Sequence, residues 1–416
     1  MIDSHAARNA VESAAREHYG RLVAFLSSRT RDVAAAEDAL SEALLAALTS
    51  WAHSGIPNSP EAWLLTAARR RLVDRARHEK MREANALTLE ILASEPFDAE
   101  PPGPLPDERL KLLFVCAHPA IDADMRTPLM LQAVLGLEGA QIARAFLVAP
   151  ATMSQRLVRA KNKIREAGIA FEVPEARDLP DRLDAVLDAI YAAYGNGWED
   201  AAGVDARARG LAEEAIWLAR VLLEVMPDEP EAQGLLALML HCEARRPARR
   251  SEGGRFVPLS EQDPNRWNAP MIADAERVLA SAARFGRPGR FQLEAAIQSV
   301  HAERARTGRT DWHAIALFYE RLVQLSPALG ALVARAAAVA EVKGARRGLE
   351  LLDEVGARAA ANYQPYWAVR AHLLKGVNRY SEAVDAFDRA LGLADDDAVR
   401  RQLLDRLTEI TEISVF

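Results

Sequence analysis

Strong helix formers dominate this sequence. Ala, Leu, Arg and Glu are the commonest residues, and runs of β-branched residues are scarce. Helices favour the first group, whereas strands need β-branched and aromatic runs. Half of the 416 residues are apolar, so the chain can bury hydrophobic cores. We therefore expect an all-α protein, which the length alone divides into two to four domains.

A proline-rich segment separates the first two of these domains. Residues 95–106 contain five prolines and a glycine, and such a segment cannot continue a helix. We expect an N-terminal helical domain at residues 1–82, an extended linker at 83–106 and a second small helical domain at 107–173. A long helical extension at residues 182–416 completes the chain.

Charge and cysteine usage exclude several classes of protein. A formal net charge of −7 disfavours a protein that coats nucleic acid without specificity. The two cysteines, Cys116 and Cys242, exclude a disulfide framework and favour a reducing cytoplasm. His118 and His241 lie near them in sequence, but ligands from two distant pairs would make an unusual zinc site. We therefore expect no metal and no cofactor.

Other familiar signals are missing from the sequence. It has no apolar run of eighteen or more residues and no apolar leader, so we expect a soluble, cytoplasmic protein that does not bind membranes. It also has no phosphate-cradling glycine loop and no nucleophile elbow, so we do not expect an enzyme.

An acidic helix precedes an arginine-rich helix in the N-terminal domain. Residues 33–48 have an apolar stripe, while Asp38 and Glu42 share another face with Leu45 alongside. The next helix, at residues 61–82, begins after Ser59 and Pro60, which suit a helix start. Such charged faces are often merely solvated. The alternative is a protein-binding helix beside a phosphate-binding helix.

Both helices resemble region 2 of extracytoplasmic-function (ECF) sigma factors. The stretch AEDALSEALL at residues 36–45 is similar to region 2.2, and WLLTAARRRLVD at 63–74 is similar to the helix that follows it. The resemblance implies that the first helix grips the clamp of core RNA polymerase through Glu37, Asp38, Glu42 and Leu45. It implies that the second helix and the loop before it bind and open the −10 element, through Asn58, Arg69, Arg70, Arg71, Arg75, Arg77 and Lys80.

The second domain contains a helix-turn-helix pattern. A short helix at residues 137–146, a turn at 147–150 and a longer helix at 151–166 have the required spacing. The longer helix is basic, and Leu157 and Ile164 are among the residues expected to face the core.

The same pattern resembles region 4 of ECF sigma factors, from AQIARAF at residues 140–146 to TMSQRLVRAK at 152–161. The resemblance implies that this helix reads the −35 element of promoter DNA. Ser154, Gln155 and Arg156 would face base edges, and Arg159 and Lys161 would contact phosphates. The candidate −35 residues are Thr152, Ser154, Gln155, Arg156, Arg159 and Lys161.

The extension contains tetratricopeptide-like helical hairpins. The spacing of its small and aromatic residues is clearest in the repeat formed by Trp367, Ala371, Tyr380, Ala383, Phe387 and Ala390. Residues 312–327 and 328–355 read as poorer repeats, the second with its turn at Gly344. The extension also contains a basic cluster, formed by Arg245, Arg246, Arg249 and Arg250. We interpret it either as a solvated helix end or as a docking site for the acidic linker or the polymerase.

The extension also resembles that of one ECF subgroup with a DUF6596-type C-terminal part, as in LLALMLH at residues 235–241 and QDPNRWN at 262–268. Members of that subgroup are commonly encoded beside a small DGPF/YCII-like protein, which makes that protein a candidate partner by resemblance. We expect the extension either to mask the DNA-binding helices or, as we favour, to add a polymerase contact.

Three functions are compatible with these patterns. The first is an ECF-type sigma factor that directs core RNA polymerase to promoters. The second is a conventional helix-turn-helix regulator with a tetratricopeptide sensor domain, which would not need the paired acidic and arginine-rich helices. The third is a helical scaffold without a DNA role, in which both basic helices would be coincidental.

Overall fold

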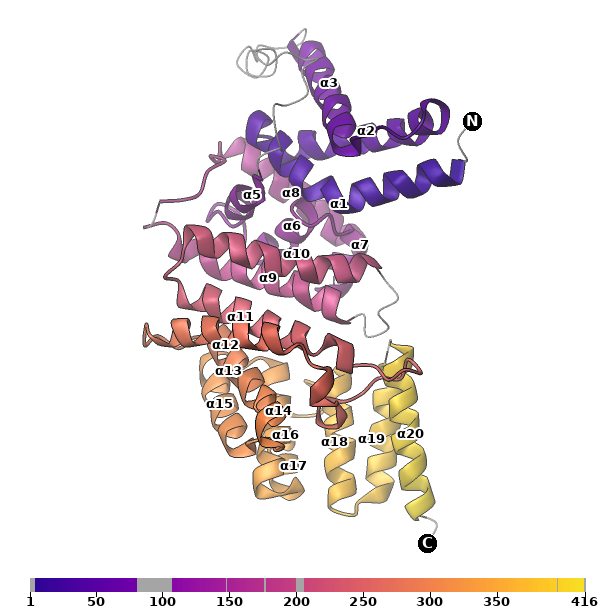
Figure 1. Cartoon of the computed structure of the whole chain (residues 1–416), viewed down its shortest axis with the longest axis vertical. Helices are drawn as coiled ribbons and strands as arrows, with labels where there is room; N and C mark the ends of the chain where they lie inside the picture. The colour runs from indigo at the N-terminus through magenta and orange to yellow at the C-terminus, as the bar shows by residue number, and fades with distance from the viewer. Residues whose placement is uncertain are drawn as a thin grey trace. The chain divides into compact units, whose positions relative to one another are not determined.

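We analysed a computed structural model, which describes residues 4–80, 107–146, 148–175, 177–199, 206–394 and 396–414. The regular secondary structure of these residues is helical (Figure 1). Among the same residues, one isolated β-bridge joins Arg250 and Phe256. The expected all-α class is confirmed. The described ranges contain no helix that is long and apolar enough to cross a membrane. The chain divides into two compact units, Met1–Ala193 and Tyr194–Phe416.

Three helices form the N-terminal domain of the first unit: α1 (Ser4–Thr30), α2 (Val33–Ser54) and α3 (Pro60–Lys80). The side chain of Asp32 caps α2 by accepting a hydrogen bond from the Ala35 amide at 3.0 Å. Each of the three helices packs against the other two.

The expected start of α3 is observed, and Ser59 Oγ accepts a hydrogen bond from the Ala62 amide at 3.4 Å. The end of α2 differs, since the helix continues past Leu48 to Ser54. Leu48 is 39% exposed and so lies outside the buried stripe, whereas Trp51 is fully buried and meets Trp63 edge-on at 5.6 Å.

Four helices form the helix-turn-helix domain: α5 (Arg109–Cys116), α6 (Ala123–Ala133), α7 (Gly139–Ala145) and α8 (Pro150–Glu166). Its core includes the fully buried Leu112, Leu113 and Phe114 of α5. Leu157 and Ile164 of α8 are 1% exposed, as the periodicity predicts. This domain and the N-terminal domain pack together within the first unit.

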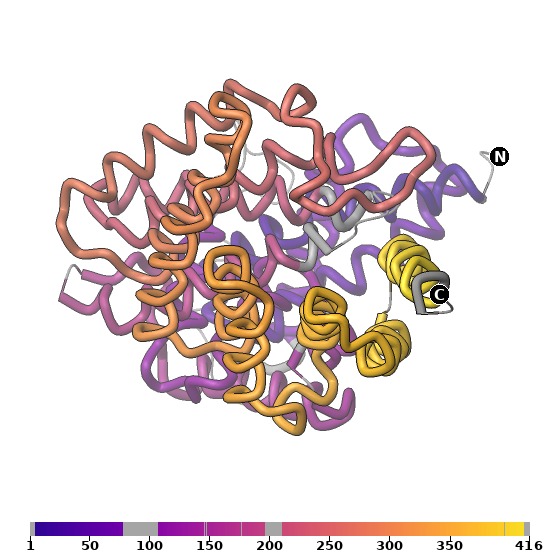
Figure 2. The backbone as a smooth tube through the Cα atoms, turned by 90° about the horizontal axis from the view of Figure 1, so that it is seen from below, coloured from indigo at the N-terminus to yellow at the C-terminus, as the bar shows by residue number. Residues whose placement is uncertain are grey.

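The division between the two units falls within α9 (Pro180–Glu199). The second unit continues with α10 (Ala206–Val225), α11 (Pro230–Ala244), α12 (Ala269–Ala283), α13 (Arg290–Ala302), α14 (Arg304–Thr307), α15 (Trp312–Leu325), α16 (Leu329–Lys343), α17 (Ala345–Val355), α18 (Gln364–Gly376), α19 (Tyr380–Gly392) and α20 (Asp397–Ser414). Helices that follow one another from α15 to α20 pack side by side, and in Figure 2 the last of them, in yellow, are seen nearly end-on.

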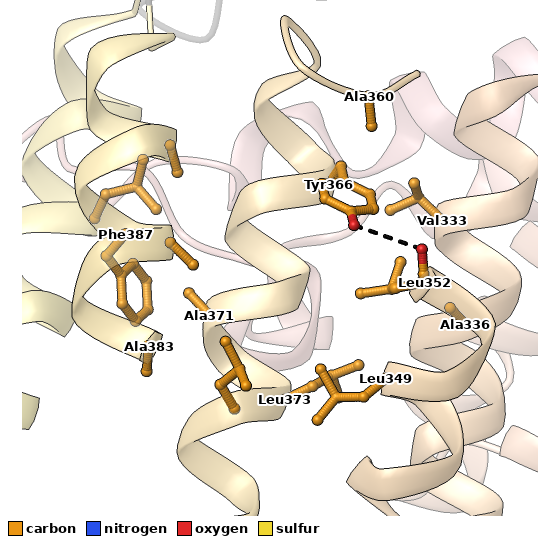
Figure 3. Packing of buried hydrophobic residues seen from close by; sticks show 14 of the residues in the cluster. Val333, Ala336, Leu349, Leu352, Ala360, Tyr366, Ala371, Leu373, Ala383 and Phe387 are labelled. Carbon is orange, nitrogen blue, oxygen red and sulfur yellow. Dashed lines mark hydrogen bonds between the residues drawn. The ribbon is translucent and has the colours of Figure 1, made fainter. Parts of the chain in front are cut away.

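Small residues and an aromatic ring fill the seam between α18 and α19. Ala371, Ala383 and Ala390 are fully buried, and Phe387 is nearly so. Figure 3 shows Ala371 of α18 next to Phe387 and Ala383 of α19. The Tyr366 hydroxyl donates to the Leu352 carbonyl oxygen at 3.5 Å, which connects this seam to α17. The tetratricopeptide-like spacing therefore places its small residues where two helices approach closely.

An insertion between α11 and α12, at residues 245–268, reaches the last helix. Arg255 pairs with Asp405 at 2.6 Å, and Glu261 pairs with Arg406. Arg304 of α14 donates to the carbonyl oxygens of Ser260 and Gln262. The insertion therefore connects the middle of the second unit to its end.

The basic cluster at the start of this insertion is not a solvated helix end. Arg245 is only 6% exposed and donates to the Gln298 side chain at 2.5 Å. Arg246 pairs with Glu243 at 2.6 Å, and Arg250 donates to the Gly254 carbonyl oxygen at 2.5 Å. These arginines are used inside the extension to hold the insertion in place.

Acid should destabilise the second unit through His301. Burial, followed by the charges of Arg245 and Arg304, lowers the pKa of His301 to about 4. An unfolded histidine has a pKa of about 6.5, so the unfolded chain binds more protons between these values. The free energy of unfolding is therefore unaffected by His301 above about pH 6.5. On acidification towards pH 4 we expect this free energy to fall by up to roughly 1.4 kcal/mol per pH unit.

Urea unfolding between pH 4.5 and 7.5 measures this dependence. The His301→Gln variant should show a shallower loss on acidification than the wild type. The control is His313→Gln, because His313 is exposed and its replacement should keep the wild-type slope. Equal slopes for the His301→Gln variant and the wild type would contradict the assignment.

Candidate functional site

The acidic face of α2 is exposed and pairs with arginines of α3. Asp38 Oδ2 lies 3.1 Å from Arg75 Nη1, and Glu42 Oε2 lies 3.4 Å from Arg71 Nε. All four side chains are about half exposed, so water screens these pairs and each contributes little to stability. The carboxylates therefore remain available to exchange these arginines for a cationic partner.

An apolar side chain lies beside these carboxylates. Leu45, one turn along α2 from Glu42, is 66% exposed. A large apolar side chain flanked by carboxylates, on a rigid helix, is a surface suited to a protein partner. Three of the four predicted polymerase-contact residues, Asp38, Glu42 and Leu45, thus share one accessible face.

The loop before α3 spans residues 55–59, because α2 extends to Ser54 and α3 begins at Pro60. Gly55 has a φ of 94°, and its amide donates to the Trp51 carbonyl oxygen at 3.1 Å, which closes α2. Asn58 is exposed, and so is Ile56 at 41%. The loop therefore presents one amide and one apolar side chain to solvent.

The arginines of α3 divide into two kinds. Arg70, Arg71, Arg75 and Arg77 are exposed. Arg69 is partly buried, and its guanidinium lies 5.3 Å from the centre of the Phe25 ring, a cation–π contact with α1. The predicted −10 residue Lys80 has a side chain outside the described residues.

The helix-turn-helix presents its predicted base-reading residues to solvent. Ser154, Gln155, Arg156 and Arg159 are exposed on α8, and Thr152 is half-buried near the start of that helix. A capping box between Glu138 and Gln141 fixes the start of α7, where the Glu138 amide donates to Gln141 Oε1 at 3.1 Å.

A cavity of about 540 Å³ adjoins the basic face of α8. Its lining includes Arg156, Arg159 and Lys163 of α8 together with Asp122 and Asp124 at the start of α6. Basic and acidic side chains therefore share this cavity, and its lining is not purely cationic.

Glu37, from the predicted polymerase contact, and Lys161, from the predicted −35 contact, are buried against each other. Glu37 of α2 and Lys161 of α8 are 8% and 9% exposed, and the Lys161 ammonium donates to Glu37 Oε2. Burial raises the pKa of Glu37 even though Lys161 opposes this effect. Neither side chain is accessible to a polymerase or to DNA in this arrangement.

A second ion pair joins the same two helices. Arg165 Nη1 lies 3.2 Å from Asp32 Oδ2. The other carboxylate oxygen of Asp32, Oδ1, is the one that caps α2. Sequence reasoning did not single out Asp32, Arg165 or the cavity-lining Lys163 as functional residues. No local pattern marks the first two, because their partners lie more than a hundred residues away in the sequence.

The described residues include no group of three or more His, Cys, Asp or Glu side chains that could hold a metal ion. Cys116 is fully buried, and burial raises the pKa of its thiol.

Comparison with known proteins finds family matches for two parts of the chain. Residues 14–82 match the family model described as Sigma-70 region 2. Residues 182–283 match a family of unknown function, DUF6596. The chain is 39% identical over 387 residues to the protein named "Uncharacterized protein R00370" from Rhizobium meliloti (strain 1021), and the match covers 91% of each chain. No solved structure matches the chain.

Removing Lys161 should destabilise the first unit strongly. The Lys161→Ala substitution leaves Glu37 buried without its cation, which costs about 3 kcal/mol or more. When folding raises the pKa of a carboxyl group, the folded protein becomes less stable as pH rises above the unfolded pKa of that group. The stability that Lys161→Ala loses relative to the wild type should therefore be larger at about pH 8 than at about pH 5. Urea unfolding at both pH values measures it.

Lys163→Ala is the matched control, since Lys163 lies on the same helix but is exposed. Its cost should stay within about 0.5 kcal/mol. Similar costs for both substitutions would show that the Glu37–Lys161 contact is not a buried ion pair in solution.

Proposed function

The chain belongs to the sigma-70 family and carries a C-terminal DUF6596 extension, and we propose that it is an ECF-type sigma factor that directs core RNA polymerase to promoters. It would act in the cytoplasm, where it would bind the polymerase through α2, open the −10 element through α3 and the loop before it, and read the −35 element through α8. The observation that carries this proposal is the Sigma-70 region 2 match, which spans the exposed face of Asp38, Glu42 and Leu45.

The charge pattern on α2 and α3 supports this division of roles. The two surface pairs, Asp38–Arg75 and Glu42–Arg71, are weak enough to be exchanged for stronger intermolecular pairs. When a polymerase cation takes the carboxylate, the arginine is released at the same time for a DNA phosphate. Polymerase binding would thereby increase the positive charge that α3 presents to the promoter.

The helix-turn-helix supports a separate reading step. Gln155 and Arg156 near the start of α8 are exposed and can reach base edges in the major groove, and Arg159 one turn later suits a phosphate. A conventional regulator would have the same helix-turn-helix, but it would have no need for a region 2 domain.

We propose that the extension is a protein-interaction domain with a regulatory role. Leu317 and Leu325 lie on α15 and are 72% and 45% exposed, an unusual exposure for large apolar side chains. Their exposure is compatible with a protein partner, and the small DGPF/YCII-like protein suggested by the subgroup resemblance is our candidate. A pull-down of that protein with the full chain, and with a Leu317→Glu variant, would test it.

Charge reversal on α2 should abolish polymerase binding without unfolding the chain. The double variant Asp38→Lys/Glu42→Lys places two cations where a cationic or polar polymerase surface should dock. Because both side chains are exposed, the melting temperature should change by only a few degrees. We expect at least a hundredfold loss of affinity for core polymerase in a binding titration.

The control for this experiment is Glu17→Lys, a reversal of an exposed carboxylate on a different helix, α1. It should retain wild-type affinity. Unchanged affinity in the Asp38→Lys/Glu42→Lys variant would exclude α2 as the polymerase contact.

Substitutions on α8 should separate base reading from phosphate binding. Arg156→Ala should change which −35 sequences are used, because an arginine–guanine contact discriminates by about 1–3 kcal/mol. Arg159→Ala should weaken all promoters alike and lower the salt dependence of binding by about one counterion. Promoter selection from a randomised −35 library measures both effects. A uniform loss with Arg156→Ala would mean that α8 is oriented differently on DNA.

A further inference from the structure

Arg245 is a buried cation whose hydrogen-bond partners are neutral. It follows α11, a helix whose side chains are mostly buried, and it is itself 6% exposed. Its Nη2 donates to Gln298 Oε1 at 2.5 Å and to Cys242 Sγ at 3.7 Å. The thiol of Cys242 is neutral, because burial raises its pKa. The other terminal nitrogen of Arg245, Nη1, is buried and has no hydrogen-bond partner among the described residues, an arrangement that proteins usually avoid.

Further cations surround Arg245 on neighbouring elements of the extension. Burial, with the charges of Arg246 and Arg245 added, lowers the pKa of Arg249 to about 10. Burial and then the charge of Arg245 lower the pKa of Arg304 in α14. Arg245 and Arg304 both oppose the protonation of His301 in α13. These groups are therefore close enough to repel one another, and Arg245, Arg249, Arg304 and His301 together are the Arg245 site.

The carboxylates near this site are engaged with other arginines. Glu243 accepts hydrogen bonds from Arg246 at 2.6 and 2.9 Å, and Glu294 accepts one from Arg290 at 2.9 Å. The partners of Arg304 are neutral, namely two backbone carbonyl oxygens and the face of an aromatic ring. The C-terminal end of α11 adds only about half a negative charge. The described residues therefore balance the positive charge of the Arg245 site only in part.

The donors of this site determine which ligand it suits. Arginine side chains donate hydrogen bonds and accept none, so the complementary ligand is an acceptor with negative charge. Several cations that repel one another are offset better by a dianion than by a monoanion. The low exposure of Arg245 admits only a small group, and a guanidinium pairs readily with two oxygens of one phosphate.

We propose that the extension binds a phosphate group at the Arg245 site, with Arg245 Nη1 as the central donor and with Arg249 and Arg304 supplying charge around it. The ligand is inorganic phosphate or the phosphate group of a small monoester. Arg249 and Arg304 are only partly buried, so the ligand enters from their side. The proposal concerns the extension alone and does not depend on the proposed sigma-factor function.

Calorimetric titration of the full chain tests the site directly. The probes are inorganic phosphate and, separately, glycerol 3-phosphate, and acetate is the carboxylate control. We expect one saturable site for a phosphate probe, and the tighter of the two probes identifies the source of the phosphate group. Acetate should bind at least about tenfold more weakly, since it brings a single charge and two oxygens.

Two substitutions test the donors. Arg245→Lys keeps a buried cation but removes the planar fork, and it should weaken phosphate binding about tenfold or more. Arg304→Gln removes one charge from the partly buried side and should weaken binding about threefold. The matched control is Arg284→Gln, an exposed arginine of the same unit, which should bind phosphate as the wild type does.

Thermal melting checks folding and specificity together. A ligand at about ten times its Kd should raise the melting temperature by about 3 °C or more. Phosphate also stabilises proteins without binding, because it is excluded from their surfaces. The specific effect is therefore the part of the rise that the wild type and Arg284→Gln show and that Arg245→Lys lacks.

The pKa of His301 reports occupancy of the site independently. Burial holds this pKa low and the charges of Arg245 and Arg304 lower it further, so a bound dianion should raise it. NMR titration of the histidine ring protons with and without phosphate measures the change, and the His301→Gln variant assigns the signal.

Saturable phosphate binding that Arg245→Lys weakens, together with a higher pKa of His301, would support the site. The absence of saturable binding by both phosphate probes would overturn it. Wild-type affinity in both Arg245→Lys and Arg304→Gln would also overturn it. Acetate that binds as tightly as phosphate would overturn the assignment of the ligand as a phosphate group.

Discussion

The buried pair of Glu37 and Lys161 constrains how the two domains of the first unit pack. These residues are 124 positions apart, and they come from α2 and α8, helices of different domains. Desolvation of two charges is costly and is offset only where the partners meet closely. The Asp32–Arg165 pair joins the same two helices, so the N-terminal and helix-turn-helix domains share two ion pairs within the first unit.

The same residue types have different roles according to their environment. Asp38 is adjacent to Glu37 in the sequence, but it lies on the solvent face of α2 in a weak pair with Arg75. Arg69 packs on Phe25, whereas the next residue of α3, Arg70, is exposed. Exposed pairs are exchangeable and suit recognition, and buried pairs fix structure. This distinction separates the residues that can contact polymerase and DNA in this arrangement from those that cannot.

Local patterns in the sequence were sufficient to predict most helices. The start of α3 followed from Ser59 and Pro60, and the turn between α16 and α17 occurs at Gly344, whose φ of 88° suits glycine. The seam of Ala371, Ala383 and Phe387 followed from a spacing that any packed helical hairpin needs. Each of these signals lies within a few turns of chain, where propensity and periodicity act.

Contacts between distant residues were not predictable in this way. Glu37 and Lys161 looked like surface charges because each lies in a charged, amphipathic helix, and nothing local indicates that these helices meet. Arg245 looked like part of a solvated helix end, but it is buried beside Gln298 of α13. Periodicity identifies which face of a helix is apolar, but not which distant element covers its polar residues. The exposed part of the candidate site was therefore the easier part to predict.

Reconstituted run-off transcription tests the central claim most directly. Core RNA polymerase, freed of other sigma factors, would be combined with the purified full chain and a library of genomic promoter fragments. The account predicts transcripts with defined starts only when the chain is present, and a shared pair of sequence elements about 25 base pairs apart upstream of those starts. A chain that binds DNA fragments without the polymerase, yet yields no transcript with it, would contradict the account.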